Sequence, residues 1–159
     1  MRGLLILAFS LLSLNTFAAG SKIDIPKYDW SWKGFFGTYD RASAQRGLKV
    51  YREVCAGCHS MDLIAYRNLA DLGFSEAHIK AIAAEYLIPD GPNDEGEMFE
   101  REAIPSDRFA NPYPNVQAAR AANNGAYPPD LSLIVKARPK GADYLKALLL
   151  GYVEAPADK

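Results

Sequence analysis

Apolar residues recur at helical spacing in several separate stretches of the chain. The clearest apolar stripe predicts a helix over residues 41–54, with Asp40 placed to cap its first turn. The residues of that stripe are Ala44, Leu48, Tyr51 and Cys55. The same spacing predicts further helices over residues 61–72, 75–88, 116–124, 131–137 and 142–150. No strand is predicted, so the pattern indicates an all-α fold.

The stretches between these helices are irregular. Residues 21–39 contain many aromatic side chains without a clear period, which predicts an arm that covers part of a core. Residues 90–100, from Asp90 to Glu100, combine turn-forming residues with five carboxylates and predict an acidic loop. The loop is either an ordinary solvated segment or a surface that attracts a positively charged redox partner. Residues 105–114 extend the irregular part of the chain.

The start of the chain has the pattern of a secretory signal peptide. Arg2 precedes an apolar run that ends at Leu14, and small residues around Ala18 suit cleavage there. We therefore expect residues 1–18 to be a signal peptide and residues 19–159 to be one exported domain. An uncleaved anchor is the alternative for the same segment.

Composition narrows the classes of function. The sequence has 159 residues and a formal net charge of −1, without a long basic block, which argues against a nucleic-acid partner. After the signal segment, the longest apolar run, residues 147–153, is far shorter than the roughly 18 residues that a membrane crossing needs. We therefore expect one domain in which no membrane anchor is visible.

The candidate chemistry lies in Cys55-Ala56-Gly57-Cys58-His59, which contains both cysteines of the chain. C-x-x-C-H is the attachment pattern of a c-type haem. Two thiols at this spacing suit thioether bonds to the two vinyl groups of a porphyrin, and His59 would be an axial iron ligand. A zinc site would need four ligands, and only His78 remains; two cysteines are also compatible with a disulfide or a redox dithiol. The pattern predicts one covalently attached haem c.

Two further segments are candidates for the haem surroundings. Arg120 lies in an alanine-rich helix, where a guanidinium is unexpected unless it meets an anion such as a haem propionate. An ordinary surface arginine is equally compatible with the pattern. Tyr127, Pro128 and Pro129 form a stiff bend that would suit the wall of a flat cofactor pocket. His78 has charged neighbours and is expected in solvent.

These segments together give the chain a family resemblance. It resembles cytochrome c1, the haem subunit of the ubiquinol:cytochrome c reductase (cytochrome bc1) complex, over nearly all of residues 19–159. The matching segments are Arg46–Tyr51, Cys55–Met61, Gly91–Phe99, Pro112–Asn115, Ala118–Ser132 and Asp143–Tyr152. C-x-x-C-H alone indicates only a c-type cytochrome, whereas the alanine-arginine helix followed by a double proline is far more specific.

The resemblance implies a cytochrome c-like helical domain with long irregular loops around the haem. It implies thioether sites at Cys55 and Cys58, an axial ligand at His59, and haem contacts at Arg120 and at Tyr127, Pro128 and Pro129. The family passes one electron from the Rieske iron-sulfur protein to a soluble cytochrome c and assembles with cytochrome b. In a bacterium this implies the periplasmic side of the inner membrane.

The end of the sequence departs from the family. Its members place a methionine, the sixth iron ligand, beyond the segment that matches Gly151-Tyr152, and then a membrane-spanning helix. This sequence contains neither, so we expect a fragment whose sixth ligand lies beyond Lys159. Met61 is too close to His59 to reach the opposite face of the iron, and Met98 belongs to a segment without a ligand role. A soluble periplasmic monohaem carrier, or a haem sensor or enzyme with an open axial site, would also be compatible with this end.

Overall fold

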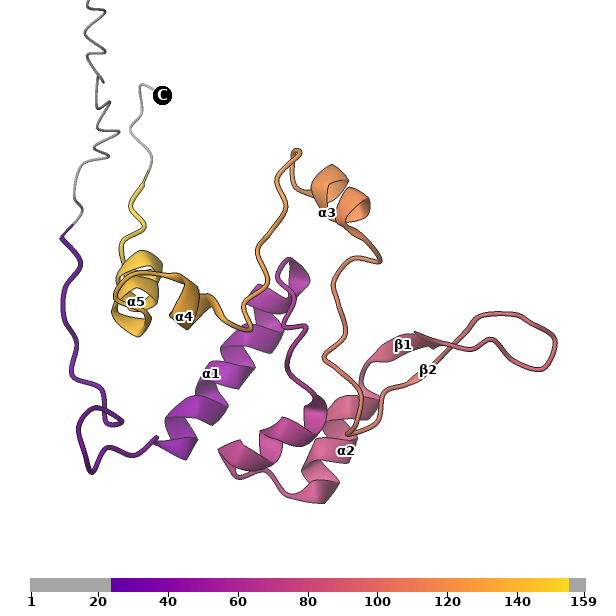
Figure 1. Cartoon of the computed structure of the whole chain (residues 1–159), viewed down its shortest axis with the longest axis horizontal. Coiled ribbons are helices and arrows are strands. Elements are labelled where there is room, and N and C mark those ends of the chain that lie inside the picture. The colour runs from indigo at the N-terminus through magenta and orange to yellow at the C-terminus, as the bar shows by residue number, and fades with distance from the viewer. Residues whose placement is uncertain (1–23, 155–159) are drawn as a thin grey trace, which may run out of the picture.

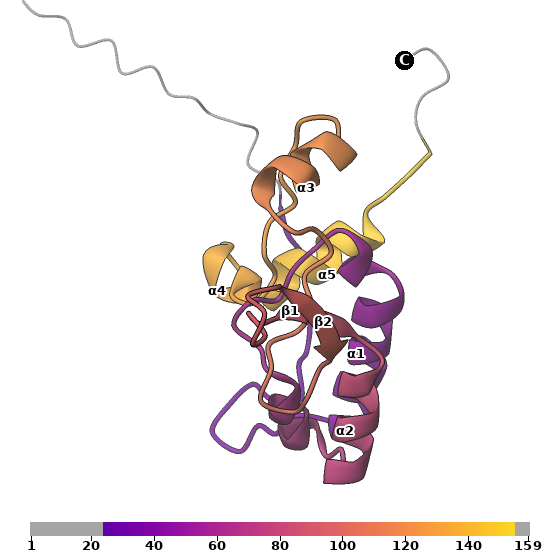
Figure 2. The ribbon, with the colours of Figure 1, turned by 90° about the vertical axis from the view of Figure 1, so that its right-hand side faces the viewer.

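The computed structural model describes residues 24–154 and places short helices around a small core. Helices α1, η2 and α2 lie together, a two-stranded hairpin projects away from them, and α3 stands apart (Figure 1). A view turned by 90° shows the same separation of α3 (Figure 2). The elements in chain order are α1 (Arg41–Glu53), η1 (Cys55–Gly57), η2 (Tyr66–Leu72), α2 (Glu76–Ala84), β1 (Leu87–Asp90), β2 (Phe99–Glu102), α3 (Val116–Ala122), α4 (Ile134–Ala137) and α5 (Ala142–Leu150); η1 and η2 are 3₁₀ helices.

The prediction of an all-α fold was wrong. β1 and β2 form an antiparallel hairpin in which Leu87 pairs with Glu102 and Asp90 with Phe99. The segment predicted as a loop therefore contributes the end of β1, the turn and the start of β2. Asn93 closes that turn, because its side-chain oxygen accepts hydrogen bonds from the backbone of Glu95 (3.1 Å) and Glu97 (2.8 Å).

Contacts with the rest of the molecule hold the hairpin. An isolated two-stranded hairpin is marginally stable in water, so it needs packing or side-chain support. Arg101 donates to Asp90 across the strands and to both carboxylate oxygens of Asp107, at 2.7 and 3.2 Å. The backbone of Ala103 donates to Tyr86 at 2.9 Å, next to α2. Both partners of Arg101 lie outside β2, which is why periodicity could not reveal them.

Side-chain caps fix the starts of three helices. The carboxylate of Asp40 accepts from Ser43, the hydroxyl of Ser75 accepts from His78, and the amide oxygen of Asn115 accepts from Ala118. These caps confirm the predicted starts of α1, α2 and α3, and α5 has the predicted bounds. The helix predicted over residues 61–72 is shorter, since only its second half is helical, as η2.

The core of the described residues lies between α1, η2 and α2. It consists of six buried side chains, here called the aromatic core: Tyr66, Leu69, Ile79, Ala83, Ala103 and Phe109. The rings of Tyr66 and Phe109 lie 4.8 Å apart, and those of Tyr66 and Tyr86 5.7 Å apart. By contrast, residues 111–129, here called the α3 region, bury only Ala119.

The aromatic arm packs on α5. Trp30 donates its indole N–H to the Asp143 carboxylate at 2.6 Å, and the backbone of Tyr28 donates to the same oxygen at 3.2 Å. The ammonium of Lys146 lies 4.1 Å from the ring centre of Tyr28, a cation–π contact. The arm therefore covers one face of α5 and not the buried core, so the expectation that it covers a core was wrong.

The predicted signal peptide, residues 1–18, lies outside the described residues. Among the helices of residues 24–154, none has the length and apolar content that crossing a membrane requires.

Candidate functional site

The C-x-x-C-H motif forms a single tight turn at the end of α1. The carbonyl of Cys55 accepts hydrogen bonds from the backbone of Cys58 at 3.1 Å and of His59 at 2.9 Å. Both cysteines are free thiols; Cys55 is half-buried and Cys58 is exposed. The turn thus presents two available sulfur atoms beside one imidazole.

The imidazole of His59 has a defined orientation. Its Nδ1 lies 2.8 Å from the carbonyl oxygen of Pro129, a residue 70 positions away in the chain. A carbonyl can only accept, so Nδ1 carries the proton and donates it to this bond. The lone pair is then on Nε2, which is the nitrogen left to bind a metal.

Tyr51 holds the backbone of the same histidine. Its hydroxyl donates to the carbonyl of His59 at 3.2 Å, and its ring stacks on Phe109 with centres 6.0 Å apart. Burial, with a smaller contribution from the charge of Asp130, raises the pKa of the Tyr51 phenol to about 12. The phenol therefore stays protonated and donates at neutral pH.

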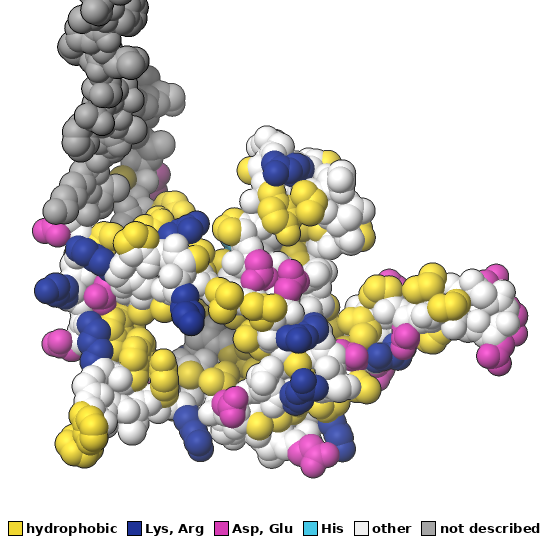
Figure 3. Space-filling view, in the orientation of Figure 1, with side chains coloured by type: hydrophobic (Ala, Val, Ile, Leu, Met, Phe, Trp, Pro, Cys, Tyr) yellow, Lys and Arg dark blue, Asp and Glu magenta, His cyan; other side chains and the backbone are white. Residues whose placement is uncertain are grey.

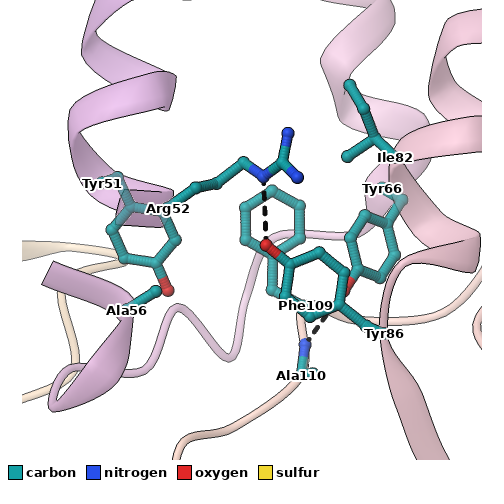
Figure 4. Close-up of a pocket in the computed structure, with 8 residues that line it drawn as sticks. All are labelled: Tyr51, Arg52, Ala56, Tyr66, Ile82, Tyr86, Phe109 and Ala110. Atoms are coloured by element: carbon teal, nitrogen blue, oxygen red, sulfur yellow. Dashed lines mark hydrogen bonds between the residues drawn. The ribbon is translucent and has the colours of Figure 1, made fainter. Parts of the chain in front are cut away.

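An aromatic cluster lies beside Ala56 of the motif, as Figure 4 shows. Ala56 of the motif lines a small gap with Tyr51, Tyr66, Tyr86 and Phe109, among others. Arg52 Nε donates to the Tyr86 hydroxyl at 3.0 Å, and the backbone of Ala110 donates to the Tyr66 hydroxyl at 3.3 Å. Ala56 therefore places the motif next to Tyr66 and Phe109 of the aromatic core.

Asp130 joins the segment after the motif to the segment after the double proline. Its Oδ2 accepts from the Ser60 hydroxyl (2.8 Å) and from the backbone of Asp62 (2.7 Å), while Oδ1 accepts from the backbone of Ser132 (2.8 Å). These bonds lower the pKa of the carboxyl although partial burial opposes them. Asp130 does not cap the next helix, because Leu133 precedes α4 without a side-chain cap.

A hollow of about 210 Å³ lies between the motif and α3. Its wall includes Cys58 from the motif, Tyr113 and Ala119 from the α3 region, and Tyr127 and Pro128 from the bend. The structure therefore brings Cys58, Tyr127 and Pro128 to one surface. Pro129 lies beside them through its bond to His59.

Arg120 lies outside the wall of that hollow. Its side chain is exposed, donates to the carbonyl of Gly125 at 2.8 Å, and lies over the Tyr127 ring at 6.0 Å from the ring centre. The structure thus places Arg120 beside one predicted site residue, Tyr127. His78 is exposed on α2, as expected.

Comparison with known proteins decides the family. A sequence model described as the Cytochrome C1 family matches residues 30–159. The chain belongs to the cytochrome c1 family. It is 53% identical over 151 residues to "Cytochrome c1 1, heme protein, mitochondrial" of Arabidopsis thaliana, covering 92% of this chain and 49% of the relative. It is 55% identical over 130 residues to "Cytochrome c1" of Rhodospirillum rubrum, covering 82% and 48%.

A third relative of the cytochrome c1 family is named for its complex. It is the "Cytochrome b-c1 complex catalytic subunit, mitochondrial" of Candida albicans, 52% identical over 139 residues, covering 87% of this chain and 48% of the relative. The chain thus spans about half the length of these curated relatives.

The donor set suits the haem of a cytochrome c1 family member. Two free thiols and one imidazole with a free Nε2 lie on one turn. Beside them is a hollow whose wall combines aromatic and proline side chains with polar ones. Within residues 24–154 no cluster of three or more His, Cys, Asp or Glu side chains is arranged to hold a metal ion, so the zinc hypothesis gains no support.

Sequence reasoning missed two residues of this site. Tyr51 was assigned only to an apolar stripe, and Asp130 was given no part in the site. Tyr at a core-facing position beside the motif, and Asp directly after a double proline, are the signals that could have drawn attention to them.

Proposed function

We propose that this chain binds one haem c through thioethers at Cys55 and Cys58, with His59 as an axial iron ligand. The observation that supports it most is the turn at residues 55–59, with two free thiols next to an imidazole whose Nδ1 is already used. A bound haem would supply an iron that alternates between ferric and ferrous states and so carries one electron. The heme protein names of the relatives agree with this proposal.

The residues around the haem would position and shield it. Pro129 would orient the imidazole, while Tyr127 and Pro128 would exclude water from one side of the group. Arg120, beside Tyr127, is proposed as the partner of a haem propionate, because a guanidinium binds carboxylates in a bidentate manner.

Covalent attachment can be tested directly. We expect the wild-type protein, produced in a host that matures c-type cytochromes, to retain haem on a denaturing gel. A Cys55→Ala/Cys58→Ala variant should lose the covalent haem signal completely. His59→Ala should lose the normal spectrum, whereas His78→Ala, the matched control on the exposed face of α2, should keep it. Retention of covalent haem by the double cysteine variant would contradict the proposal.

The proposed role is that of the cytochrome c1 subunit of a cytochrome bc1 complex. The chain would accept an electron from the Rieske iron-sulfur protein and pass it to a soluble cytochrome c, in contact with cytochrome b. The family membership and the complex named for the Candida relative support this role over a small diffusible carrier or a haem sensor. Its place would be the periplasmic side of a bacterial inner membrane, reached through the signal peptide proposed at residues 1–18.

Recovery of the complex tests this role. The full-length product should co-purify with cytochrome b and the Rieske protein from solubilised membranes. Isolation of the full-length, haem-loaded product without either protein would point to the diffusible carrier instead.

The tip of the β1–β2 hairpin is the proposed docking surface for a basic cytochrome. Asp94, Glu95 and Glu97 are exposed there, and Figure 3 shows acidic side chains gathered at the end of the hairpin. Asp90 is excluded from this surface charge because Arg101 pairs with it. Complementary charge speeds encounter more than it strengthens the final complex.

Charge reversal at the tip tests the docking surface. Glu95→Lys/Glu97→Lys should slow electron transfer to a basic cytochrome at low salt by about tenfold and flatten its salt dependence. Glu53→Lys/Asp71→Lys makes the same change of charge on the exposed surface of α1 and η2, and should have a smaller effect. Equal effects of the two double variants would refute docking at the hairpin.

The second axial ligand is proposed to come from outside residues 24–154. Of the two methionines in that range, Met61 packs against the aromatic core and Met98 lies 65% exposed beside the hairpin turn. Replacing either methionine with leucine should therefore leave the iron coordination spectrum of the full-length protein unchanged.

A further inference from the structure

We propose that Asp130 is a positioning residue that sets how strongly His59 donates electrons to a bound iron. It would do so without touching the imidazole, by holding the Pro129 carbonyl against Nδ1. The inference rests on the proposed function, since it requires haem iron on Nε2 of His59.

The hydrogen bonds of Asp130 lie directly beside the contact between His59 and Pro129, on its C-terminal side. Asp130 follows Pro129, and its Oδ2 binds the hydroxyl of Ser60, the residue that follows His59, at 2.8 Å. The backbone of Leu131 donates in turn to the carbonyl of Ser60 at 2.9 Å. The two chain segments are thus joined one residue beyond the bond between His59 and Pro129.

Two more bonds extend the same connection. Asp130 Oδ2 also accepts from the backbone of Asp62 at 2.7 Å, and the hydroxyl of Ser132 accepts from the backbone of Leu63 at 3.0 Å. Residues 60–63 and 130–132 therefore form one unit. The carboxylate of Asp130 is its centre, because it accepts from both segments.

Hydrophobic packing could not replace this connection. Pro129 is exposed, and in the α3 region that precedes the connection only Ala119 is buried. Ser60, by contrast, is 8% exposed, the only buried polar residue among those described. Loss of the Asp130 carboxylate would leave the buried hydroxyl of Ser60 without its acceptor, which is unfavourable for a buried polar group.

The chemical consequence follows from the bond at Nδ1. A carbonyl that accepts the Nδ1 proton makes an imidazole more electron-rich and a better ligand. An electron-rich ligand stabilises ferric iron more than ferrous iron. Loosening the Pro129 contact should therefore raise the reduction potential and let the Nδ1 proton exchange faster with solvent.

Three variants of the haem-loaded protein distinguish the positioning effect of Asp130 from the effect of its negative charge. Asp130→Ala removes both the connection and one negative charge. Ser60→Ala removes one hydrogen bond of the connection and no charge. Asp62→Asn removes a nearby negative charge but keeps the backbone N–H that binds Asp130. For each variant, the reduction potential and the exchange rate of the His59 Nδ1 proton in the ferrous state are measured.

We expect Asp130→Ala to speed Nδ1 proton exchange by about tenfold, the size of effect that one lost hydrogen bond gives. Its potential should rise more than that of Asp62→Asn. Ser60→Ala should shift both quantities in the same direction by less, and Asp62→Asn should shift the potential alone.

The inference is overturned if Asp130→Ala exchanges at the wild-type rate and its potential matches that of Asp62→Asn. If Asp130→Ala fails to fold, Ser60→Ala decides, since unchanged exchange in that variant refutes the connection. A wild-type protein without covalent haem would instead refute the proposed function. The two failures are therefore distinguishable.

Discussion

The aromatic core and the α3 region are built in different ways. Both contain a helix that begins with a side-chain cap, Ser75 for α2 and Asn115 for α3. α2 buries Ile79 and Ala83 against the aromatic core, whereas α3 buries only Ala119. The first region is held by packing of apolar side chains, and the second depends more on hydrogen bonds and turns. The candidate haem site lies where the two meet.

Because of this difference, the two sides of the site, the turn at residues 55–59 and the bend at residues 127–129, are held in place by different interactions. The turn at residues 55–59 lies next to packed aromatic rings through Ala56, and Tyr51, which stacks on Phe109, donates to the carbonyl of His59. The bend at residues 127–129 buries no side chain, and its end is fixed by the hydrogen bonds that the Asp130 carboxylate accepts from Ser60 and Asp62. Packing therefore positions the attachment residues, while polar contacts position the opposite wall.

The largest expected difference between the regions concerns their tyrosines. Tyr66 is 2% exposed and Tyr127 is 44% exposed. Tyr66→Ala should lower the free energy of unfolding by about 3–5 kcal/mol, because it leaves a cavity among the rings. Tyr127→Ala should lower it by about 1 kcal/mol or less. Urea denaturation of both variants measures this, and similar losses would show that the α3 region is packed like the core.

A smaller expected effect concerns the caps. Ser75→Ala and Asn115→Ala should each cost about 1 kcal/mol of helix stability. In α2 the loss should lower the stability of the whole aromatic core, whereas in α3 it should increase local opening only. Hydrogen exchange by residue separates these results, with Ser75→Asp and Asn115→Asp as controls that keep an acceptor. A drop in protection of α2 caused by Asn115→Ala would mean that the two regions unfold together.

The hairpin should differ from both regions in its response to acid. Hydrogen bonds from Arg101 hold the pKa values of Asp90 and Asp107 below the usual range. A carboxyl with a lowered folded pKa stabilises the fold above its unfolded pKa, about 4, and this stability is lost as pH falls through the folded value. As the pH falls below about 4, the backbone amides of β1 and β2 should therefore lose their protection against hydrogen exchange before the amides of α2 do. Arg101→Gln should abolish this acid-induced loss of protection in the hairpin. Glu95→Gln, a control at the tip, should leave it unchanged.

The smallest expected effect concerns the aromatic arm. Trp30→Phe keeps most of the ring contact but removes the bond to Asp143, which is 2.6 Å long. We expect a quencher to reduce the fluorescence of the remaining Trp32 more strongly than in the wild type, because its indole becomes more accessible. The free energy of global unfolding should change little. Trp32→Phe, which leaves the bond to Asp143 in place, is the matched control. A large loss of global stability in Trp30→Phe would make the arm part of the core.

Local signals predicted the starts of three helices and missed the hairpin, since Leu87 and Ile88 of β1 were predicted as the end of a helix. Asp40, Ser75 and Asn115 each act within three residues of their own position, so the sequence alone locates these helix starts. The pairing of β1 with β2 is supported by contacts that Arg101 and Ala103 make with residues outside β2, Asp107 and Tyr86. Periodicity does not reveal such contacts, so the turn-forming residues of the segment 90–100 led to the prediction of a loop.

The sequence by itself determined the chemistry and the family of this protein. The spacing of Cys55, Cys58 and His59 fixes two thiols and an imidazole on one turn, because residues so close in the chain can only be neighbours. Only the tertiary structure decided what faces them: Pro129 and Asp130 reach His59 and Ser60 across 70 residues. No periodic pattern encodes such a contact, since it depends on how the aromatic core and the α3 region close around the site.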